Sequence, residues 1–260
     1  GRAKTRTAIS FQAFTLAEIL ITLGIIGVVA ALTIPGLLQK NYDRTAYTKL
    51  LKTYAVLNQA FQQAVEEEGT VDMWCDASTF HSGNLESCQK AIPEVLSRYL
   101  NIQKLKVQTK YKYRTIKSKY FYLGANNNYT TAYTLKDGTI LYFSIYAGDN
   151  YSENWCKASK DLTGAGRFYY HCGILLVDIN GLSGPNTNNR DLFGFKIFQD
   201  GVSPIGNIAD ENASYWHRFK ESCMQDIGSA GSCAGWVLET GNLDYQYCSD
   251  LSYKNKRKCK

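Results

Sequence analysis

A long apolar run near the start of the chain restricts the fold more than any other feature. Residues 19–34 contain no charged side chain, and apolar residues extend the run to 14–38. At about 1.5 Å per helical residue, roughly 20 such residues cross the hydrocarbon core of a bilayer. The flank before the run has no acidic residue and carries Arg2, Lys4 and Arg6, which is typical of a cytoplasmic end. The sequence therefore predicts an exported chain with one membrane-spanning helix over residues 14–38.

Two residues of this apolar segment need an explanation. A carboxylate in hydrocarbon costs several kcal/mol unless it is paired, so Glu18 either has a functional partner or snorkels to the nearby headgroups. We favour a functional partner. Pro35 either terminates the helix or bends a helix that continues. No small-residue cleavage site follows the run, whereas Ala13 lies directly before it, so cleavage there would retain the run and expose Phe14.

The segment "FTLAEILITLGIIGVVAALTIP" resembles the prepilin-type cleavage and methylation segment of type IV pilins and type II secretion pseudopilins. The residues that match in type and spacing are Phe14, Thr15, Leu16, Glu18 and Pro35. Ala13 differs from the family pattern, which usually has Gly before the Phe. The resemblance covers only this segment of the 260 residues.

The resemblance implies a role and a set of partners for these residues. Prepilin peptidase would remove residues 1–13 as a basic leader, and the new amine of Phe14 would be methylated. Glu18 of one subunit would pair with such an amine of another, and Pro35 would bend a continuing helix, so these three residues would serve assembly. The further partners would be other pilin or pseudopilin subunits and the inner-membrane assembly platform.

The same resemblance implies a location. The chain would first be a single-pass protein of the inner (cytoplasmic) membrane with an extracytoplasmic head. It would then become part of a filament, either an extracellular type IV pilus or a periplasmic type II secretion pseudopilus.

A second apolar pattern continues the helix beyond the apolar run. From Tyr47, apolar side chains recur alternately three and four residues apart, with charged and amide side chains in the gaps. The apolar positions are Leu50, Tyr54, Leu57, Phe61 and Ala64 or Val65. The spacing predicts an amphipathic second half of the helix over residues 39–69, ending near Gly69. A long helix of this kind resembles the spine of a pilin.

Residues 70–260 are numerous enough for one core and predict one extracytoplasmic α+β head domain. Alternating residues on both sides of Asp137-Gly138 indicate a hairpin over 129–146, and two further β-rich runs follow at 170–179 and 191–199. These runs predict a four-stranded antiparallel sheet against the long helix, a pilin-like arrangement. A short helix is expected at Pro93 to Leu100.

The cysteines of the exported part indicate disulfides rather than a zinc site. They are Cys75, Cys88, Cys156, Cys172, Cys223, Cys233, Cys248 and Cys259. An even number of cysteines on an oxidising side of the membrane favours disulfides, and we expect each cysteine to pair with its neighbour in sequence. The chain has no Cys-x-x-Cys motif, and its three histidines show no ligand spacing with the cysteines. The region after Asp200 shows little β alternation, so we expect disulfides to order it.

An oxygen-rich loop, "VDINGLSGPNTNNRDLFGF", has two interpretations. Its Asp178, Asn180 and Asp191 are candidate calcium ligands, and the resemblance supports this because some pseudopilins bind calcium in a loop beside the sheet. Turn chemistry explains the same residues, since Asn, Asp and Gly tolerate positive φ and cap backbone amides. We favour the turn interpretation and expect no other cofactor.

A basic, tyrosine-rich stretch over residues 104–122 also has two interpretations. Its seven Lys or Arg side chains between aromatic residues could bind nucleic acid or an anionic glycan. They equally describe a strand with one solvated face, which we favour. The overall charge agrees with this choice, because removal of the leader lowers the count of Lys and Arg from 29 to 26 against 23 acidic residues.

The sequence predicts a structural subunit rather than an enzyme. It contains no nucleophile, base and acid constellation, no phosphate-binding loop and no metal-hydrolase motif. The predicted function is that of a minor or surface-specialised pilin or pseudopilin, assembled through its N-terminal helix. The alternative is a single-pass, membrane-anchored binding protein that does not polymerise and binds an anionic ligand such as DNA or glycan.

Overall fold

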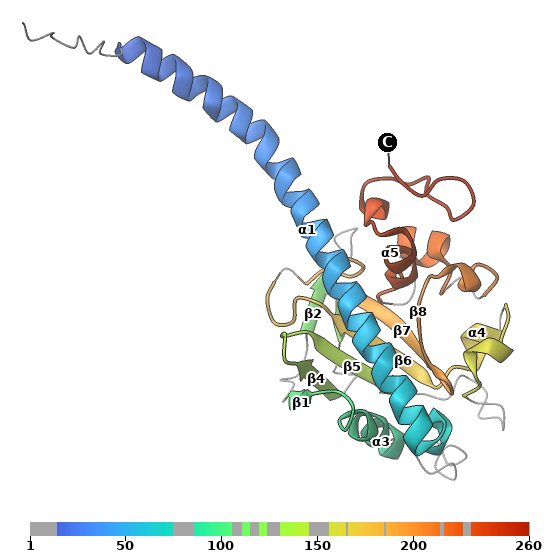
Figure 1. The fold of residues 1–260 in the computed structure, drawn as a ribbon. Coiled ribbons are helices and arrows are strands. Elements are labelled where there is room, and N and C mark those ends of the chain that lie inside the picture. The colour runs from blue at the N-terminus through green and yellow to red at the C-terminus, as the bar shows by residue number, and fades with distance from the viewer. Residues whose placement is uncertain are drawn as a thin grey trace, which may run out of the picture. The chain divides into compact units, whose positions relative to one another are not determined.

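The chain contains two compact units, Gly1–Asp43 and Arg44–Lys260. The computed structural model describes residues 15–74, 86–105, 111–114, 120–123, 131–145, 156–164, 166–184, 186–213, 216–225 and 230–259. Helix α1, Leu16–Glu68, belongs to both units, and the second unit has an α+β fold around a six-stranded antiparallel sheet (Figure 1). The unit boundary lies inside the part of the helix, residues 39–69, that was predicted to be amphipathic.

The second half of α1 packs as its sequence predicts. Its buried residues recur at intervals of mostly three and four and are Ala46, Leu50, Thr53, Leu57, Ala60, Phe61 and Ala64. The helix ends at Glu68, and Gly69 follows with φ +83°, the left-handed conformation that glycine adopts after a helix end. Pro35 lies inside α1, so the helix continues past this proline as the resemblance implies.

The sheet has six strands rather than the predicted four. Its order is β1-β4-β5-β6-β7-β8, and every neighbouring pair is antiparallel. The strands are β1 Ile102–Leu105, β4 Thr131–Leu135, β5 Ile140–Ile145, β6 Gly173–Asp178, β7 Leu192–Phe198 and β8 Gly201–Pro204. The predicted strands are β4 to β7. The missed strands β1 and β8 are the two edges, and β8 contains Gly and Pro, which are depleted in strands and mark turns.

The predicted hairpin around Asp137-Gly138 is present between β4 and β5. The Gly138 N–H donates to the Leu135 carbonyl at 3.0 Å, and Gly138 has φ +86°. Asp137 Oδ1 accepts a hydrogen bond from the Thr139 N–H at 3.2 Å, which stabilises the turn through an Asx side chain.

A second, two-stranded antiparallel sheet consists of β2 Tyr111–Arg114 and β3 Tyr120–Leu123. The Tyr113 side chain of β2 is wholly buried and packs in the core of the second unit. The buried residues of this cluster are Tyr113, Ala132, Ile140, Tyr142, Ile174, Leu176, Leu192 and Ile205. Tyr113 therefore anchors the small sheet to the large one.

Both faces of β7 are covered, which explains why all seven of its residues are buried. The Phe195 ring stacks on Tyr54 of α1 with ring centroids 5.6 Å apart. Gly194 points to the opposite face, where an added Cβ would lie 2.8 Å from the Ala230 carbonyl oxygen. The Gly194 N–H donates to the Gly231 carbonyl at 2.8 Å. The second half of α1 and the C-terminal region thus pack on opposite faces of the strand. A Cβ on Gly231, which has φ +73°, would lie 2.1 Å from the Gly194 nitrogen, so this approach requires glycine.

Short helices and disulfides form the rest of the second unit. The helical segments are η1 Val71–Met73, α3 Glu86–Leu96, η2 Ser159–Asp161, α4 Gly166–Tyr169, η3 Ile208–Asp210, η4 Phe219–Met224, α5 Ala234–Thr240 and η5 Asp244–Gln246. Helix α3 begins and ends earlier than the predicted Pro93 to Leu100, and Pro93 lies within it. Burial of its apolar stripe, which includes Cys88, Ile92 and Leu96, stabilises the turns before the proline.

The second unit contains three of the expected disulfides, two of them in the C-terminal region after Asp200. The disulfides join Cys156 to Cys172, Cys223 to Cys233 and Cys248 to Cys259, which confirms three of the four expected neighbour pairs. Cys75, the expected partner of the buried Cys88, lies outside the described residues.

Three aromatic side chains of the C-terminal region contact one another. Phe219 stacks on Trp236 with ring centroids 4.0 Å apart, and Tyr253 lies 5.0 Å from Trp236. All three are buried. Hydrophobic packing therefore supports this region together with its disulfides.

Candidate functional site

The start of α1 carries the first candidate site, formed by Thr15 and Glu18. Glu18 Oε2 accepts hydrogen bonds from the Thr15 N–H and from the Thr15 hydroxyl, both at 2.8 Å. The Glu18 N–H donates to Thr15 Oγ1 at 3.2 Å. This reciprocal arrangement is a capping box, which satisfies backbone donors that a helix start leaves free. It holds the carboxylate in the first turn of an otherwise apolar segment.

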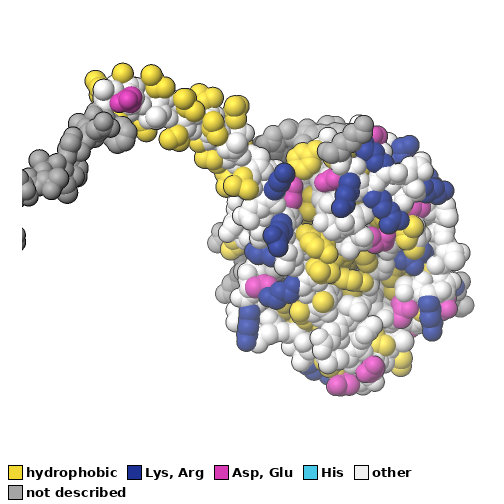
Figure 2. Space-filling view, turned by 45° about the horizontal axis from the view of Figure 1, so that its top comes forward, with side chains coloured by type: hydrophobic (Ala, Val, Ile, Leu, Met, Phe, Trp, Pro, Cys, Tyr) yellow, Lys and Arg dark blue, Asp and Glu magenta, His cyan; other side chains and the backbone are white. Residues whose placement is uncertain are grey.

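The apolar segment, residues 16–38, is exposed over most of its surface in the described part of the chain. The exposed fraction of its large apolar side chains is lowest at Ile19, 45%, and highest at Leu32, 78%. In Figure 2 hydrophobic side chains cover much of its visible face. Among the described residues, α1 is the one helix long and apolar enough to cross a membrane. An exposed apolar surface of this size is typical of a segment that contacts lipid or other protein.

The predicted processing residues Ala13 and Phe14 lie outside the described residues. Glu18 and Pro35, the other predicted assembly residues, both lie in α1. The pairing of Glu18 with an amine of Phe14 from another subunit therefore stays a prediction.

The candidate calcium ligands fall into two environments. Asp178 Oδ2 accepts a hydrogen bond from the Tyr113 hydroxyl at 2.6 Å, and Oδ1 accepts from the N–H groups of Asn180 and Gly181 at 3.1 and 3.0 Å. Burial raises the pKa of Asp178 to about 6, although these hydrogen bonds oppose the shift. Both oxygens thus already stabilise the turn and the Tyr113 anchor, as the turn interpretation requires.

Asp191 is the candidate ligand with one carboxylate oxygen that accepts no hydrogen bond. Its Oδ2 accepts from the Thr187 N–H at 2.8 Å, whereas its buried Oδ1 has no hydrogen-bond partner. Burial raises the pKa of Asp191 to about 7. In the described part of the chain, no three His, Cys, Asp or Glu side chains gather as a metal site would need. Asp191 therefore has one oxygen without a hydrogen-bond partner, whereas both oxygens of Asp178 accept hydrogen bonds, and the calcium site stays a prediction.

Most of the basic stretch 104–122 lies outside the described residues. Its parts in β1, β2 and β3 belong to antiparallel pairs. Tyr113 is buried and bonded to Asp178, so it does not offer a ring for stacking on a base. Nucleic-acid binding by this stretch stays a disfavoured prediction.

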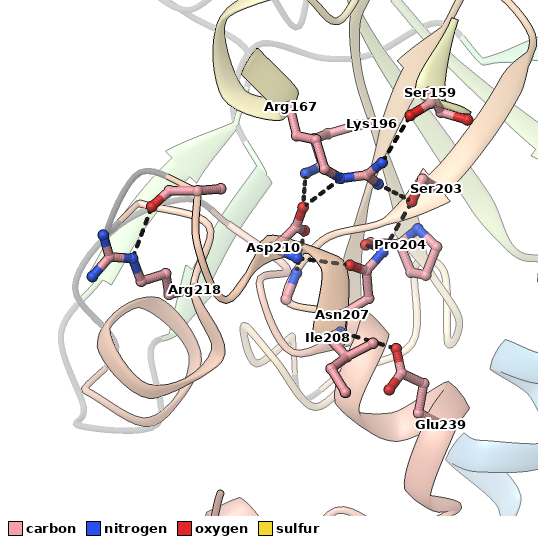
Figure 3. A network of polar contacts seen from close by, with 12 residues as sticks. Ser159, Arg167, Lys196, Ser203, Pro204, Asn207, Ile208, Asp210, Arg218 and Glu239 are labelled. Atoms are coloured by element: carbon pink, nitrogen blue, oxygen red, sulfur yellow. Dashed lines mark hydrogen bonds and ion pairs between the residues drawn. The ribbon is translucent and has the colours of Figure 1, made fainter. Parts of the chain in front are cut away.

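A buried ionic cluster was not predicted from the sequence (Figure 3). It consists of Arg167 in α4, Lys196 in β7 and Asp210 in η3. Asp210 Oδ1 accepts from Arg167 Nε at 3.2 Å and from the Lys196 ammonium group. The side chains of Lys196 and Asp210 are 0% exposed, and that of Arg167 is 9% exposed. Two cations thus share one carboxylate in the interior.

Polar groups around the ionic cluster complete its hydrogen bonds. Asp210 Oδ2 accepts from the Gly206 N–H at 3.1 Å. Arg167 Nη1 donates to the Ser159 carbonyl and Nη2 to Ser203 Oγ, each at 3.1 Å. The Asp210 N–H donates to Asn207 Oδ1 at 3.1 Å (Figure 3). The carboxylate is therefore held in one orientation between β7 and the turn after β8.

Burial lowers the pKa of Lys196 to about 8, and Arg167 adds to the shift, while Asp210 opposes it. Two buried histidines lie near this charge. The rings of His171 and His217 are 5.9 Å apart between centroids. Burial and the positive charge of Lys196 lower the pKa of His171 to about 3 and that of His217 well below its usual value. Both imidazoles therefore stay neutral near pH 7.

One sequence signal pointed to the ionic cluster. Lys196 is the lone charge inside the apolar run "LFGFKIF", where a charged residue must find a partner if the strand is buried. Its partners Arg167 and Asp210 come from separate segments, which no local pattern connects.

Residues 36–173 of the chain match a family of unknown function, DUF6613. Because the match covers more than half of the 260 residues, the chain belongs to this family. No curated protein and no solved structure matches the chain. The family match begins after Pro35, so it does not include the segment that resembles prepilins.

Proposed function

We propose that this chain is a prepilin-like structural subunit of a type IV pilus or a type II secretion pseudopilus. Prepilin peptidase removes the leader after Ala13, and the subunit assembles through its apolar segment on an inner-membrane platform. Its large head makes it a minor or surface-specialised subunit.

The observation that carries this proposal is the placement of Glu18 in an uncovered apolar helix. The apolar side chains around it need lipid or neighbouring helices, and a carboxylate in such surroundings needs a partner. Thr15 supplies two donors to Oε2 alone. Oε1 is then the acceptor for the N-terminal amine of a neighbouring subunit, which would set the register of the filament.

The test compares Glu18→Ala with Thr22→Ala in the full chain, expressed with a prepilin peptidase and an assembly platform. Thr22 is the matched control, because it is a polar residue of the same segment whose hydroxyl donates to its own backbone at Ile19 O, 3.0 Å away. We expect all variants in the membrane fraction, but only the wild type and Thr22→Ala in sheared filaments. Peptide mapping should find N-methylated Phe14 as the first residue.

Three results would overturn the proposal. The first is a membrane-extracted chain that retains residues 1–13. The second is equal incorporation of Glu18→Ala and wild type into filaments. The third is absence of wild type and variants alike from filaments despite normal membrane insertion, which would favour the anchored alternative.

A further inference from the structure

The contact between Lys196 and Asp210 has the chemistry of a cross-link as well as that of an ion pair. The two side chains are 0% exposed, and the Lys196 ammonium group contacts Asp210 Oδ1. Lys196 lies in β7 and Asp210 in η3, so the contact joins a central strand to the turn that covers it. The Phe198 ring lies 5.8 Å from Lys196 Nζ and helps to exclude water from this contact.

Burial favours a reaction between these two groups. In water, an ammonium group and a carboxylate remain ions because both are strongly hydrated. In an interior, desolvation penalises both charges, so a neutral product of similar shape is favoured. Effective concentrations of well-oriented neighbouring groups reach about 10⁵–10⁸ M, so a fixed contact favours reaction. The lowered pKa of Lys196, about 8, makes the nucleophilic amine accessible near neutral pH.

We propose that Lys196 and Asp210 form an intramolecular isopeptide bond. The ammonium group first transfers a proton to the carboxylate, and the free amine then attacks Asp210 Cγ. The Nζ–Cγ bond forms, one Cγ–O bond breaks, and the departing oxygen takes two protons from the former ammonium group and leaves as water. One ammonium and one carboxylate thus become one amide and one water, without an oxidant or a co-reactant.

Neighbouring groups are placed to assist this step. The Gly206 N–H and the Arg167 Nε–H donate to the two carboxylate oxygens, where negative charge develops after the attack. The net charge of the cluster does not change in the reaction. Arg167 keeps three acceptors, the new amide oxygen, the Ser159 carbonyl and Ser203 Oγ. Arg167 and Gly206 are therefore positioning groups for the cross-link.

The chain contains its own control, the ion pair of Lys256 with Asp250. Its atoms Nζ and Oδ2 are 2.6 Å apart, but the side chains are 33% and 64% exposed. Hydration keeps both of these groups ionic, so this pair should not react. Proximity is common to the two pairs, and burial distinguishes them.

The test is the mass of the full chain, purified in detergent, reduced, alkylated and denatured. We expect the wild type to be lighter by one water molecule than the mass calculated for its alkylated chain with the N-terminus found by peptide mapping, and Lys196→Arg to have the full calculated mass. Peptide mapping should find the Lys196 peptide joined to the Asp210 peptide, with Lys256 and Asp250 unmodified. This readout requires neither assembly nor a folded variant, so its failure would leave the filament proposal standing.

Two results would overturn the inference. One is a wild-type chain with its full calculated mass. The other is a loss of water located elsewhere, above all at Asp137 or Asp200, since each precedes a glycine and can dehydrate to a cyclic imide. In either case the cluster is an ordinary buried ion pair.

Discussion

The two halves of α1 share a secondary structure but differ in what surrounds them. In residues 16–38 apolar side chains lie on all sides, and none of them is buried in the part of the chain that the structure describes. In residues 44–68 a single apolar stripe faces the sheet, and Leu50, Leu57 and Phe61 are 0% exposed. In the described residues, one half has exposed apolar side chains, and the other packs into the core of its own unit.

This difference shows that helix formation and helix burial have separate causes. Backbone hydrogen bonds form the helix in both halves, whereas the distribution of apolar side chains decides what each half contacts. The same contrast holds for charged groups. Among the described residues, the hydrogen bonds of Glu18 come from Thr15 in its own helix turn, while buried Asp210 has donors from three segments.

The largest expected effect on stability comes from a substitution in the packed second half of α1. Phe61→Ala should lower the free energy of unfolding of the second unit by ~3–5 kcal/mol, because it leaves a cavity beside Trp74, whose ring is 6.0 Å from that of Phe61. Urea unfolding of the full chain in micelles, followed by tryptophan fluorescence, measures this change.

The control for that prediction lies in the other half of the helix. Ile26 is 62% exposed, so Ile26→Ala should leave the urea midpoint of the second unit unchanged. A comparable loss in both variants would show that the apolar segment contributes to the core of the second unit, and the contrast would be wrong.

An intermediate effect is expected at Asp191, the buried carboxylate with one unpartnered oxygen. Its folded-state pKa of about 7 exceeds the ordinary value of 3.8, so its contribution to stability is fully present below pH 3.8 and is lost as the pH rises through 7. Asp191→Asn removes this dependence and should raise the free energy of unfolding above pH 7 by ~1–3 kcal/mol. Urea unfolding at acidic and alkaline pH measures the difference.

The control for Asp191 is Asp200, whose carboxylate accepts from the N–H and the hydroxyl of Ser159 at 2.7 and 3.0 Å. Asp200→Asn should give no gain in stability at high pH, and a gain of equal size would refute the explanation by burial. We expect added Ca²⁺ to leave the wild-type and Asp191→Asn midpoints unchanged. A wild-type increase that Asp191→Asn abolishes would establish the calcium site.

The smallest effect concerns the surface of the second unit. Lys256→Gln removes the partly exposed ion pair with Asp250 and should cost less than ~1 kcal/mol, because water screens such pairs. The same urea assay measures it. A loss as large as that of Phe61→Ala would mean that surface charge, rather than the packed stripe, stabilises this unit.

The sequence alone determined the features that depend on neighbours along the chain. The apolar segment, the amphipathic stripe ending at Gly69 and the hairpin at Asp137-Gly138 all follow from local spacing and turn chemistry. The three observed disulfides join cysteines 10 to 16 residues apart, so sequence proximity was sufficient to pair them. The processing residues before α1 were predicted from a resemblance and remain predictions.

Tertiary structure alone decided the features that join distant segments. Edge strands β1 and β8 have too few residues for a periodic signal and exist because a neighbouring strand offers hydrogen bonds. Tyr113 meets Asp178 across 65 positions, and Arg167 meets Asp210 across 43. The physical reason is that a buried polar group without a hydrogen bond costs free energy. Such a group therefore pairs with a group that is near in space, even when the two are far apart in sequence.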